Sequence, residues 1–139
     1  MHTLTMLRVT ALVTLLVSSG FAQTKLPACD GDLTIVRVSR IKPGGSMDGF
    51  MKAAAAHIAW YRANKITTNQ VVTARVIETD RAAGTSKYSD TEVLQYHIRP
   101  PQRPANADDD AWKAYVKQYQ DNSDIVSEYM TCMPKHGAQ

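Results

Sequence analysis

The sequence has 139 residues and a mass of 15.4 kDa, with 44% hydrophobic and 21% charged residues. These values are typical of one globular domain and exclude collagen-like, disordered and multidomain chains. Sixteen basic and thirteen acidic residues give a formal net charge of +3, which is too small to indicate a protein that binds nucleic acid or an anionic membrane. No catalytic signature in the sequence names a reaction.

The N-terminus has the order of a secretory signal: a basic residue at Arg8, an apolar run over residues 9–17 and small or polar residues around Phe21 over 18–22. Gly20 and Ala22 fit a signal peptidase site, so we predict a signal peptide over residues 1–22 and a single domain over 23–139. The alternative is a retained anchor, but the run is far shorter than the roughly 20 residues that a bilayer span requires. Cleavage would leave a secreted or periplasmic protein without membrane contact.

Two cysteines, Cys29 and Cys132, lie near the two ends of the predicted mature chain. In an oxidising compartment they are a candidate disulfide, and the alternative is a pair of free thiols. No CxxC, HExxH or histidine-rich segment accompanies them, so neither a metal site nor any other cofactor is expected.

The first half of the domain alternates strand and helix signals. A strand is expected over Leu33–Ile41, which is rich in β-branched residues and bounded by glycine and proline. A helix follows over about Ser46–Asn64, with Ser46 as its N-cap and apolar residues at helical spacing. Alternation over Asn69–Thr79 predicts a second strand, and the polar segment Asp80–Asp90 is expected to form a hairpin loop.

The second half repeats the pattern in the order strand, helix, strand. Thr91–Ile98 supplies the third strand, prolines mark an extended connection, and a second helix is expected over about Asp109–Gln120. Ile125–Cys132 alternates as a fourth strand. The order β-α-β-β-α-β predicts the α+β ferredoxin-like fold, in which two helices cover one face of a four-stranded antiparallel sheet.

Alternation along the strands divides their residues between two faces of the sheet. The more apolar face is predicted to pack against the helices, and it comprises Val36, Val38, Val72, Ala74, Val76, Leu94, Tyr96, Ile98, Val126 and Met130. The other face mixes apolar and polar residues, and we expect a second copy of the chain to cover it. The fold brings Cys29 near Cys132, but alternation places them on opposite faces, so a bulge or irregular strand end is needed.

Three segments carry a family resemblance: I-V-R-V-S-R-I-K-P-G leading into the first helix, A-H-I-A-W-Y-R within it, and S-E-Y-M-T-C-M in the last strand. Together with the element order they resemble the dimeric α+β barrel superfamily, in which two ferredoxin-like subunits press their sheets together and enclose a ligand cavity. The superfamily includes NIPSNAP-like and EthD-like proteins, cofactor-independent monooxygenases of the antibiotic-biosynthesis type and haem-degrading enzymes. The resemblance implies a homodimer and leaves the branch and the activity unresolved.

The polar residues of the mixed face are the candidate ligand-binding residues: Arg37, Arg75, Gln95, His97 and Tyr129. His97 is interpreted as a base, haem ligand or hydrogen-bond donor, and the alternative is a partly solvated histidine at a strand end. The two arginines would attract an anionic group, unless they form ion pairs with Glu128 or Glu92. Tyr129 either orients a ligand or packs in the subunit interface.

His57 and Trp60 flank the apolar stripe of the first helix, where they either border the cavity entrance or line the helix edge. The pair Gly44-Gly45 is interpreted as a turn rather than a phosphate site. We therefore expect an exported homodimer that binds a small apolar or aromatic ligand carrying an anionic group. The alternative is a cofactor-independent monooxygenase or a haem-processing enzyme of the same superfamily, with His97 or His57 as base or ligand.

Overall fold

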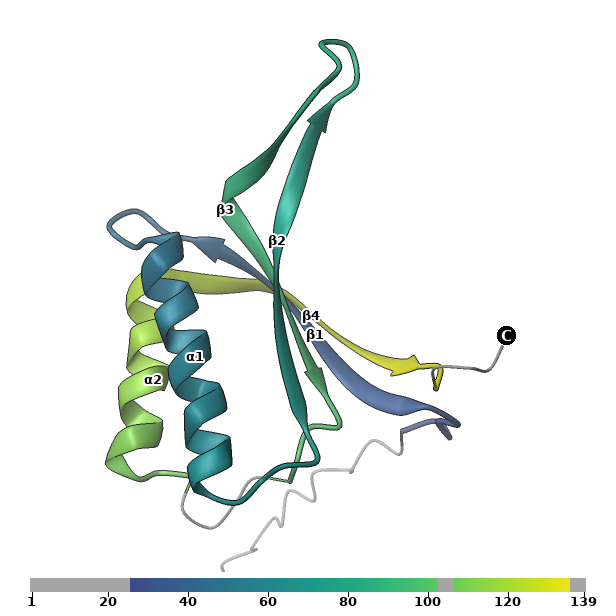
Figure 1. Cartoon of the computed structure of the whole chain (residues 1–139), viewed down its shortest axis with the longest axis vertical. Helices are drawn as coiled ribbons and strands as arrows, with labels where there is room; N and C mark the ends of the chain where they lie inside the picture. The colour runs from purple at the N-terminus through teal and green to yellow at the C-terminus, as the bar shows by residue number, and fades with distance from the viewer. Residues whose placement is uncertain (1–25, 103–106, 136–139) are drawn as a thin grey trace, which may run out of the picture.

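The computed structural model describes residues 26–102 and 107–135, so the predicted signal peptide lies outside the described residues. The elements are β1 (Asp32–Ile41), α1 (Met47–Ala63), β2 (Gln70–Asp80), β3 (Thr85–Ile98), α2 (Asp110–Asn122) and β4 (Ser123–Met133). The strands form one antiparallel sheet in the order β2-β3-β1-β4, and the two helices lie side by side on one of its faces (Figure 1). The predicted ferredoxin-like α+β fold is confirmed. No helix in the described ranges is long and apolar enough to cross a membrane.

Side-chain caps begin both helices close to the predicted positions. Ser46 caps α1, because its Oγ accepts a hydrogen bond from the backbone nitrogen of Gly49. Asp109 caps α2 in the same way and accepts from the backbone nitrogen of Trp112 at 2.7 Å. Each cap satisfies an amide that the first helical turn leaves without a partner.

The hairpin between β2 and β3 is longer than predicted. The segment expected to be a loop, Asp80–Asp90, is mostly strand, because β2 and β3 remain paired as far as Asp80 opposite Thr85. The turn is confined to residues 81–84, where the Asp80 carboxylate accepts two backbone hydrogen bonds and Gly84 has a φ of +65°. The ribbon projects beyond the helices (Figure 1), so its side chains are exposed and lack the apolar alternation that identifies a half-buried strand.

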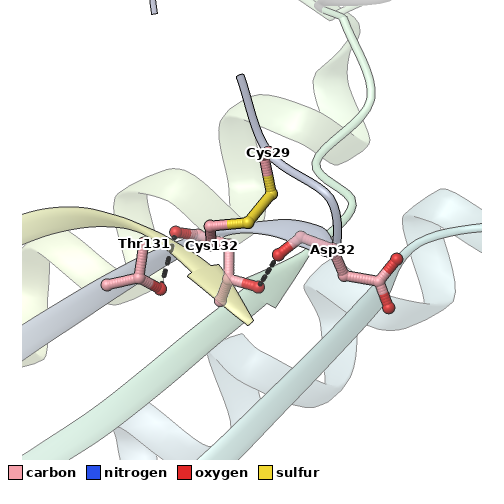
Figure 2. The surroundings of a disulfide bond; sticks show 5 residues. Cys29, Asp32, Thr131 and Cys132 are labelled. Carbon is pink, nitrogen blue, oxygen red and sulfur yellow. Dashed lines mark hydrogen bonds between the residues drawn. A yellow bond between two sulfur atoms is a disulfide. The ribbon is translucent and has the colours of Figure 1, made fainter. Parts of the chain in front are cut away.

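The predicted disulfide joins Cys29 to Cys132, with 5.6 Å between the two Cα atoms and 103 positions between them in sequence (Figure 2). It links the segment before β1 to the end of β4, beside the hydrogen bond from Thr131 Oγ1 to the carbonyl oxygen of Thr34. A crosslink over a loop of this length stabilises the fold by about 4 kcal/mol, because it restricts the unfolded chain. The bond is consistent with an oxidising environment outside the cell.

A bulge in β4 explains how the two cysteines meet. The register between β1 and β4 shifts between Val38 and Ser39, and Val126 is left without a partner in the ladder. Beyond the bulge, even-numbered residues of β4 pair with odd-numbered residues of β1, and Cys132 lies opposite Leu33. Cys132 therefore shares a face with the odd-numbered side of β1, as the bond to Cys29 requires.

The helices cover the face of the sheet opposite to the predicted one. The covered face carries Arg37 of β1 together with Gln95 and His97 of β3, which contact or face the helices. Most of the predicted core positions lie on the open face, where Tyr96 pairs with Val36 and Val72, and Leu94 pairs with Val38 and Ala74. Met130 differs, because the bulge in β4 places it opposite Ile35 on the covered side. The expectation was wrong because the helices themselves supply large apolar rings to the core, so the strands beneath them need not be apolar.

Candidate functional site

A cavity of about 770 Å³ lies between the covered face of the sheet and the two helices. Its volume falls within the range of small-molecule sites. The strands form its floor, which includes Arg37, Gln95 and His97. The helices form its roof, which is largely aromatic and includes Phe50, Tyr61, Trp112, Tyr115 and Tyr119.

A chain of hydrogen bonds crosses the cavity from floor to roof. His97 Nε2 lies 3.1 Å from Gln95 Oε1, and Gln95 Nε2 donates to Tyr119 Oη at 2.6 Å. Tyr119 Oη lies 3.4 Å from His57 Nδ1, which completes the chain. His57 and His97 are each 5% exposed and Gln95 is 4% exposed. The chain therefore connects both helices to the centre of the sheet, and it holds four polar side chains in fixed orientations.

Burial keeps these side chains uncharged at neutral pH. Removal from water, followed by the charges of His97 and Arg37, lowers the pKa of His57 to about 3. Removal from water and the charge of Arg37 lower the pKa of His97 to about 4, while Glu128 opposes the shift. Burial also raises the pKa of Tyr119 to about 12 and raises that of Tyr115. The centre of the cavity consequently offers neutral donors and acceptors.

The cationic side chain in the floor already has a partner. Arg37 Nε lies 2.6 Å from Glu128 Oε2, and this pair is the ion pair that the sequence offered as the alternative to anion binding. Lys42 and Asp124 also line the cavity and add one charge of each sign. With Glu128 counted, the cationic and anionic side chains at the cavity balance.

Tyr115 closes the roof above the histidines. Its ring stacks on that of His57, with 4.6 Å between the centroids and 13° between the planes. Tyr115 is 3% exposed, and among the described residues its Oη is the one inaccessible side-chain nitrogen or oxygen atom without a hydrogen-bond partner. A buried hydroxyl without a partner is unfavourable, so this side chain is not optimised for stability alone.

The structure brings four of the predicted site residues into the cavity: Arg37, His57, Gln95 and His97. His57 lies within the cavity rather than at its edge, because it contacts Tyr119 and the rings of His97 and Tyr115. Arg75 does not join them. Its Nη2 donates to the carbonyl oxygen of Ser89, and its guanidinium lies 4.7 Å from the centroid of the Tyr88 ring on the hairpin.

Tyr129 and Trp60 also lie outside the cavity lining. The bulge in β4 pairs Tyr129 with Val36, which places it on the open face, where it is 56% exposed. Trp60 is buried between the helices, and its Nε1 donates to the carboxylate of Asp109. Trp60 therefore supports the start of α2, and it packs against the roof residues Tyr61 and Trp112 without lining the cavity itself.

The tyrosines of the roof were not predicted as site residues. Tyr61, Tyr115 and Tyr119 belong to the apolar stripes of the two helices, and such stripes usually form a core. Their hydroxyls are the signal that was missed, because a buried tyrosine needs a polar partner. For Tyr119 the partner is Gln95, one of the polar residues that alternate along β3.

The pair Gly44-Gly45 lies in a turn before α1, as predicted, and the backbone nitrogen of Gly45 donates to the carbonyl oxygen of Lys42. Asn122 Oδ1 accepts a hydrogen bond from the backbone nitrogen of Ser46 at 2.9 Å. A Cβ atom at Gly45 would lie 2.3 Å from the carbonyl oxygen of Asn122, and one at Gly49 would lie 2.0 Å from its Oδ1. The glycines of this turn and of the first helical turn therefore admit Asn122, which locks the end of α2 to the start of α1.

Among residues 26–102 and 107–135, no group of three or more histidine, cysteine, aspartate or glutamate side chains is placed to hold a metal ion. Comparison with protein-family models gives no match, and no curated protein or solved structure is significantly similar to the chain. The ferredoxin-like fold and the geometry of the cavity are therefore the basis for any assignment of function.

Proposed function

We propose that this protein binds a small, mostly apolar aromatic molecule in the cavity between its sheet and its helices. The observation that carries the proposal is the division of the cavity into an aromatic roof and a short chain of neutral hydrogen-bonding groups. Sites for small organic ligands combine such apolar walls with a few placed polar atoms.

The ion pair between Arg37 and Glu128 argues against the anionic group expected from the sequence. A ligand carboxylate would have to compete with a carboxylate that already lies 2.6 Å from the guanidinium. The cavity centre supplies no compensating positive charge, because both imidazoles are neutral at pH 7. An uncharged ligand suits these surroundings better.

The open face of the sheet supports a homodimer of the dimeric α+β barrel type. Its central residues are apolar and lack a cover of helices: Val36, Val38, Leu94 and Tyr96, with Val72 45% exposed and Tyr129 56% exposed. A second copy of the chain can cover this surface with an identical one through a two-fold axis. In such a dimer each subunit keeps its own cavity on the outer side of the paired sheets.

Export from the cytoplasm, to the periplasm or to the outside of the cell, is part of the proposal. It is supported by the N-terminal signal pattern and by the Cys29–Cys132 bond, which a reducing cytoplasm would not maintain.

The alternative, a cofactor-independent monooxygenase or a haem-processing enzyme, has less support. A general base works best when its pKa lies near the working pH, and burial leaves both His57 and His97 far below it. Oxygen consumption with an activated phenol, or a Soret band after addition of haem, would favour this alternative.

The proposal is tested by NMR titration of the oxidised protein with a library of neutral aromatic fragments. We expect fragments that shift the side-chain resonances of His57, Gln95 and Tyr119, and we expect Val116→Trp, which fills the cavity, to remove this binding. The matched control is Val72→Trp on the open face, which should bind as the wild type does. The proposal is wrong if no fragment at millimolar concentration perturbs the cavity of the folded protein.

A further inference from the structure

The hydrogen-bond chain indicates where each histidine carries its proton. Gln95 Oε1 can only accept, so His97 donates through Nε2–H and keeps a bare lone pair on Nδ1. Gln95 Nε2 donates to Tyr119 Oη, which leaves the hydroxyl hydrogen of the tyrosine available to donate to His57 Nδ1. We take this direction for the bond between Tyr119 and His57, and the neutral His57 then carries its proton on Nε2. In this arrangement the two rings present opposite functions, an acceptor at His97 Nδ1 and a donor at His57 Nε2.

These two ring nitrogens have no partner within the described residues. Both side chains line the cavity, and their ring centroids are 5.3 Å apart. Tyr115 Oη is the one side-chain nitrogen or oxygen in the described ranges that is both inaccessible and unpartnered, so the two free nitrogens retain access to the cavity. The acceptor and the donor therefore lie on neighbouring side chains of the same cavity.

We infer that the cavity selects an aromatic ligand through an uncharged hydroxyl group, which donates to His97 Nδ1 and accepts from His57 Nε2–H. This inference rests on the proposed function and names the ligand class, a phenol. A hydroxyl is the simplest ligand group that donates and accepts through one oxygen atom. The aromatic rings of the roof suit the ring that carries it.

Other polar groups satisfy the two nitrogens less well. A carboxylate or phenolate has no hydrogen for His97 Nδ1, and it would place a negative charge beside a bare lone pair. Protonation of the imidazole does not solve this, because burial and Arg37 lower the pKa of His97 to about 4. An ether or ketone accepts from His57 but leaves His97 without a donor, and an ammonium group faces the cationic Arg37.

Four naphthalene probes test this selectivity on the protein purified with its disulfide intact: naphthalene, 2-naphthol, 2-methoxynaphthalene and 2-naphthoate. Isothermal titration calorimetry at pH 7 should give a dissociation constant for 2-naphthol about tenfold lower than for 2-methoxynaphthalene, the difference expected for one well-placed hydrogen bond of about 1.4 kcal/mol. We expect 2-naphthoate to bind no more tightly than the methyl ether.

His97→Phe tests the acceptor directly. It should weaken binding of 2-naphthol about tenfold and leave the affinity for 2-methoxynaphthalene unchanged, because only the hydroxyl donates to His97. The matched control is Thr73→Val, which removes a hydroxyl 3.4 Å from Gln95 Nε2 without touching either free nitrogen, and it should retain the preference for 2-naphthol. Long-range proton–nitrogen NMR of the wild type gives an independent measurement, in which both histidines should carry their proton on Nε2.

The outcomes separate this inference from the proposed function. If all four probes bind with similar affinity, the cavity binds aromatic molecules but does not select them through a hydroxyl group. If His97 carries its proton on Nδ1, selection through the hydroxyl group is rejected even where 2-naphthol binds. If no probe binds the folded protein, both the ligand class and the proposed function are rejected.

Discussion

The two faces of the sheet differ in a way that reverses the usual expectation. The face beneath the helices carries an ion pair, a glutamine and a histidine, whereas the face without helices carries valine, leucine and tyrosine at its centre. Adjacent residues show the contrast most clearly, because Gln95 is 4% exposed in the covered layer while its neighbours Leu94 and Tyr96 point to the open side.

The difference indicates two separate uses of the sheet. The aromatic rings of the helices supply the apolar surface of the layer between the helices and the covered face. The polar residues of the strands on this face then remain available to a ligand. The open face has no such supply, and exposed apolar surface of this kind favours the homodimer that we propose. A polar layer beneath helices combined with an apolar layer without them is consistent with the proposed ligand binding and with dimerisation through the sheet.

The largest effect should come from placing the same charge on each face in turn. Val93 is 0% exposed on the covered face, so Val93→Lys should lower the free energy of unfolding by about 3 to 5 kcal/mol, as expected for an unpaired buried charge. Leu94→Lys, one residue away on the open face, should change it by about 1 kcal/mol or less within the subunit and should dissociate the proposed dimer. Urea denaturation and light scattering after size-exclusion chromatography measure the two effects.

Equal destabilisation by the two lysines would mean that both faces are buried within one subunit, and the contrast between them would be lost. A wild type that is already monomeric at micromolar concentration would contradict the dimer without affecting the cavity.

The second effect depends on pH, because both described histidines belong to the covered side. Their pKa values are about 3 and about 4 in the folded protein and near 6.5 when unfolded, so the unfolded chain binds more protons below pH 6.5. Neutral histidines therefore do not disfavour the folded state above pH 6.5. As the pH falls toward 4, protonation of the unfolded chain progressively lowers the free energy of unfolding. Between pH 7 and pH 5 the loss is on the order of 2 kcal/mol for each histidine, from 1.36 kcal/mol per pKa unit.

Urea denaturation at pH 7, 6 and 5 measures this slope. His97→Phe should remove about half of it, since one titrating imidazole is gone. If the slope is unchanged in this variant, groups other than His97 cause the pH dependence. The pKa of His97 would then not be lowered by burial in the folded protein.

The smallest effect separates two tyrosines of the roof. Tyr115→Phe removes a buried hydroxyl without a partner and should raise the free energy of unfolding by about 1 kcal/mol, whereas Tyr119→Phe breaks the hydrogen-bond chain and should lower it by about 1 kcal/mol. Thermal denaturation of the two variants and the wild type provides the comparison. Destabilisation by both substitutions would indicate that Tyr115 Oη has a partner after all.

Element order and the disulfide were predictable from the sequence because each depends on local signals. Helical spacing, the N-cap Ser46, negative charge at the start of the second helix and β-branched runs bounded by turns identify the elements, and export together with two cysteines indicates the bond. The end of the β2–β3 hairpin was missed because an exposed ribbon is polar on both sides and has no hydrophobic alternation to detect.

The covered face was not predictable from alternation alone. Alternation places residues such as Gln95 and Leu94 on different faces, but it does not show which face the helices cover. The face with more apolar residues was predicted to be covered, and the helices cover the other one. The chain from His97 to His57 was missed for a related reason, since it joins residues that are 62 positions apart, Tyr119 and His57, through contacts that only the packed helices create. Of the predicted residues, Gln95 and His97 lie on one strand and both line the cavity, whereas the bulge in β4 moves Tyr129 to the open face.

The bond between Cys29 and Cys132 also determines how the domain bears mechanical load. When the chain is pulled by its two ends, tension passes from one end to the other through the sulfur atoms, and the helices and sheet between them carry none. After reduction the same pull would act on the start of β1 and the end of β4, which are neighbours. It would separate the two strands from that end and break their hydrogen bonds one after another. The oxidised protein therefore resists stretching through a covalent bond, and the reduced protein only through single hydrogen bonds broken in sequence.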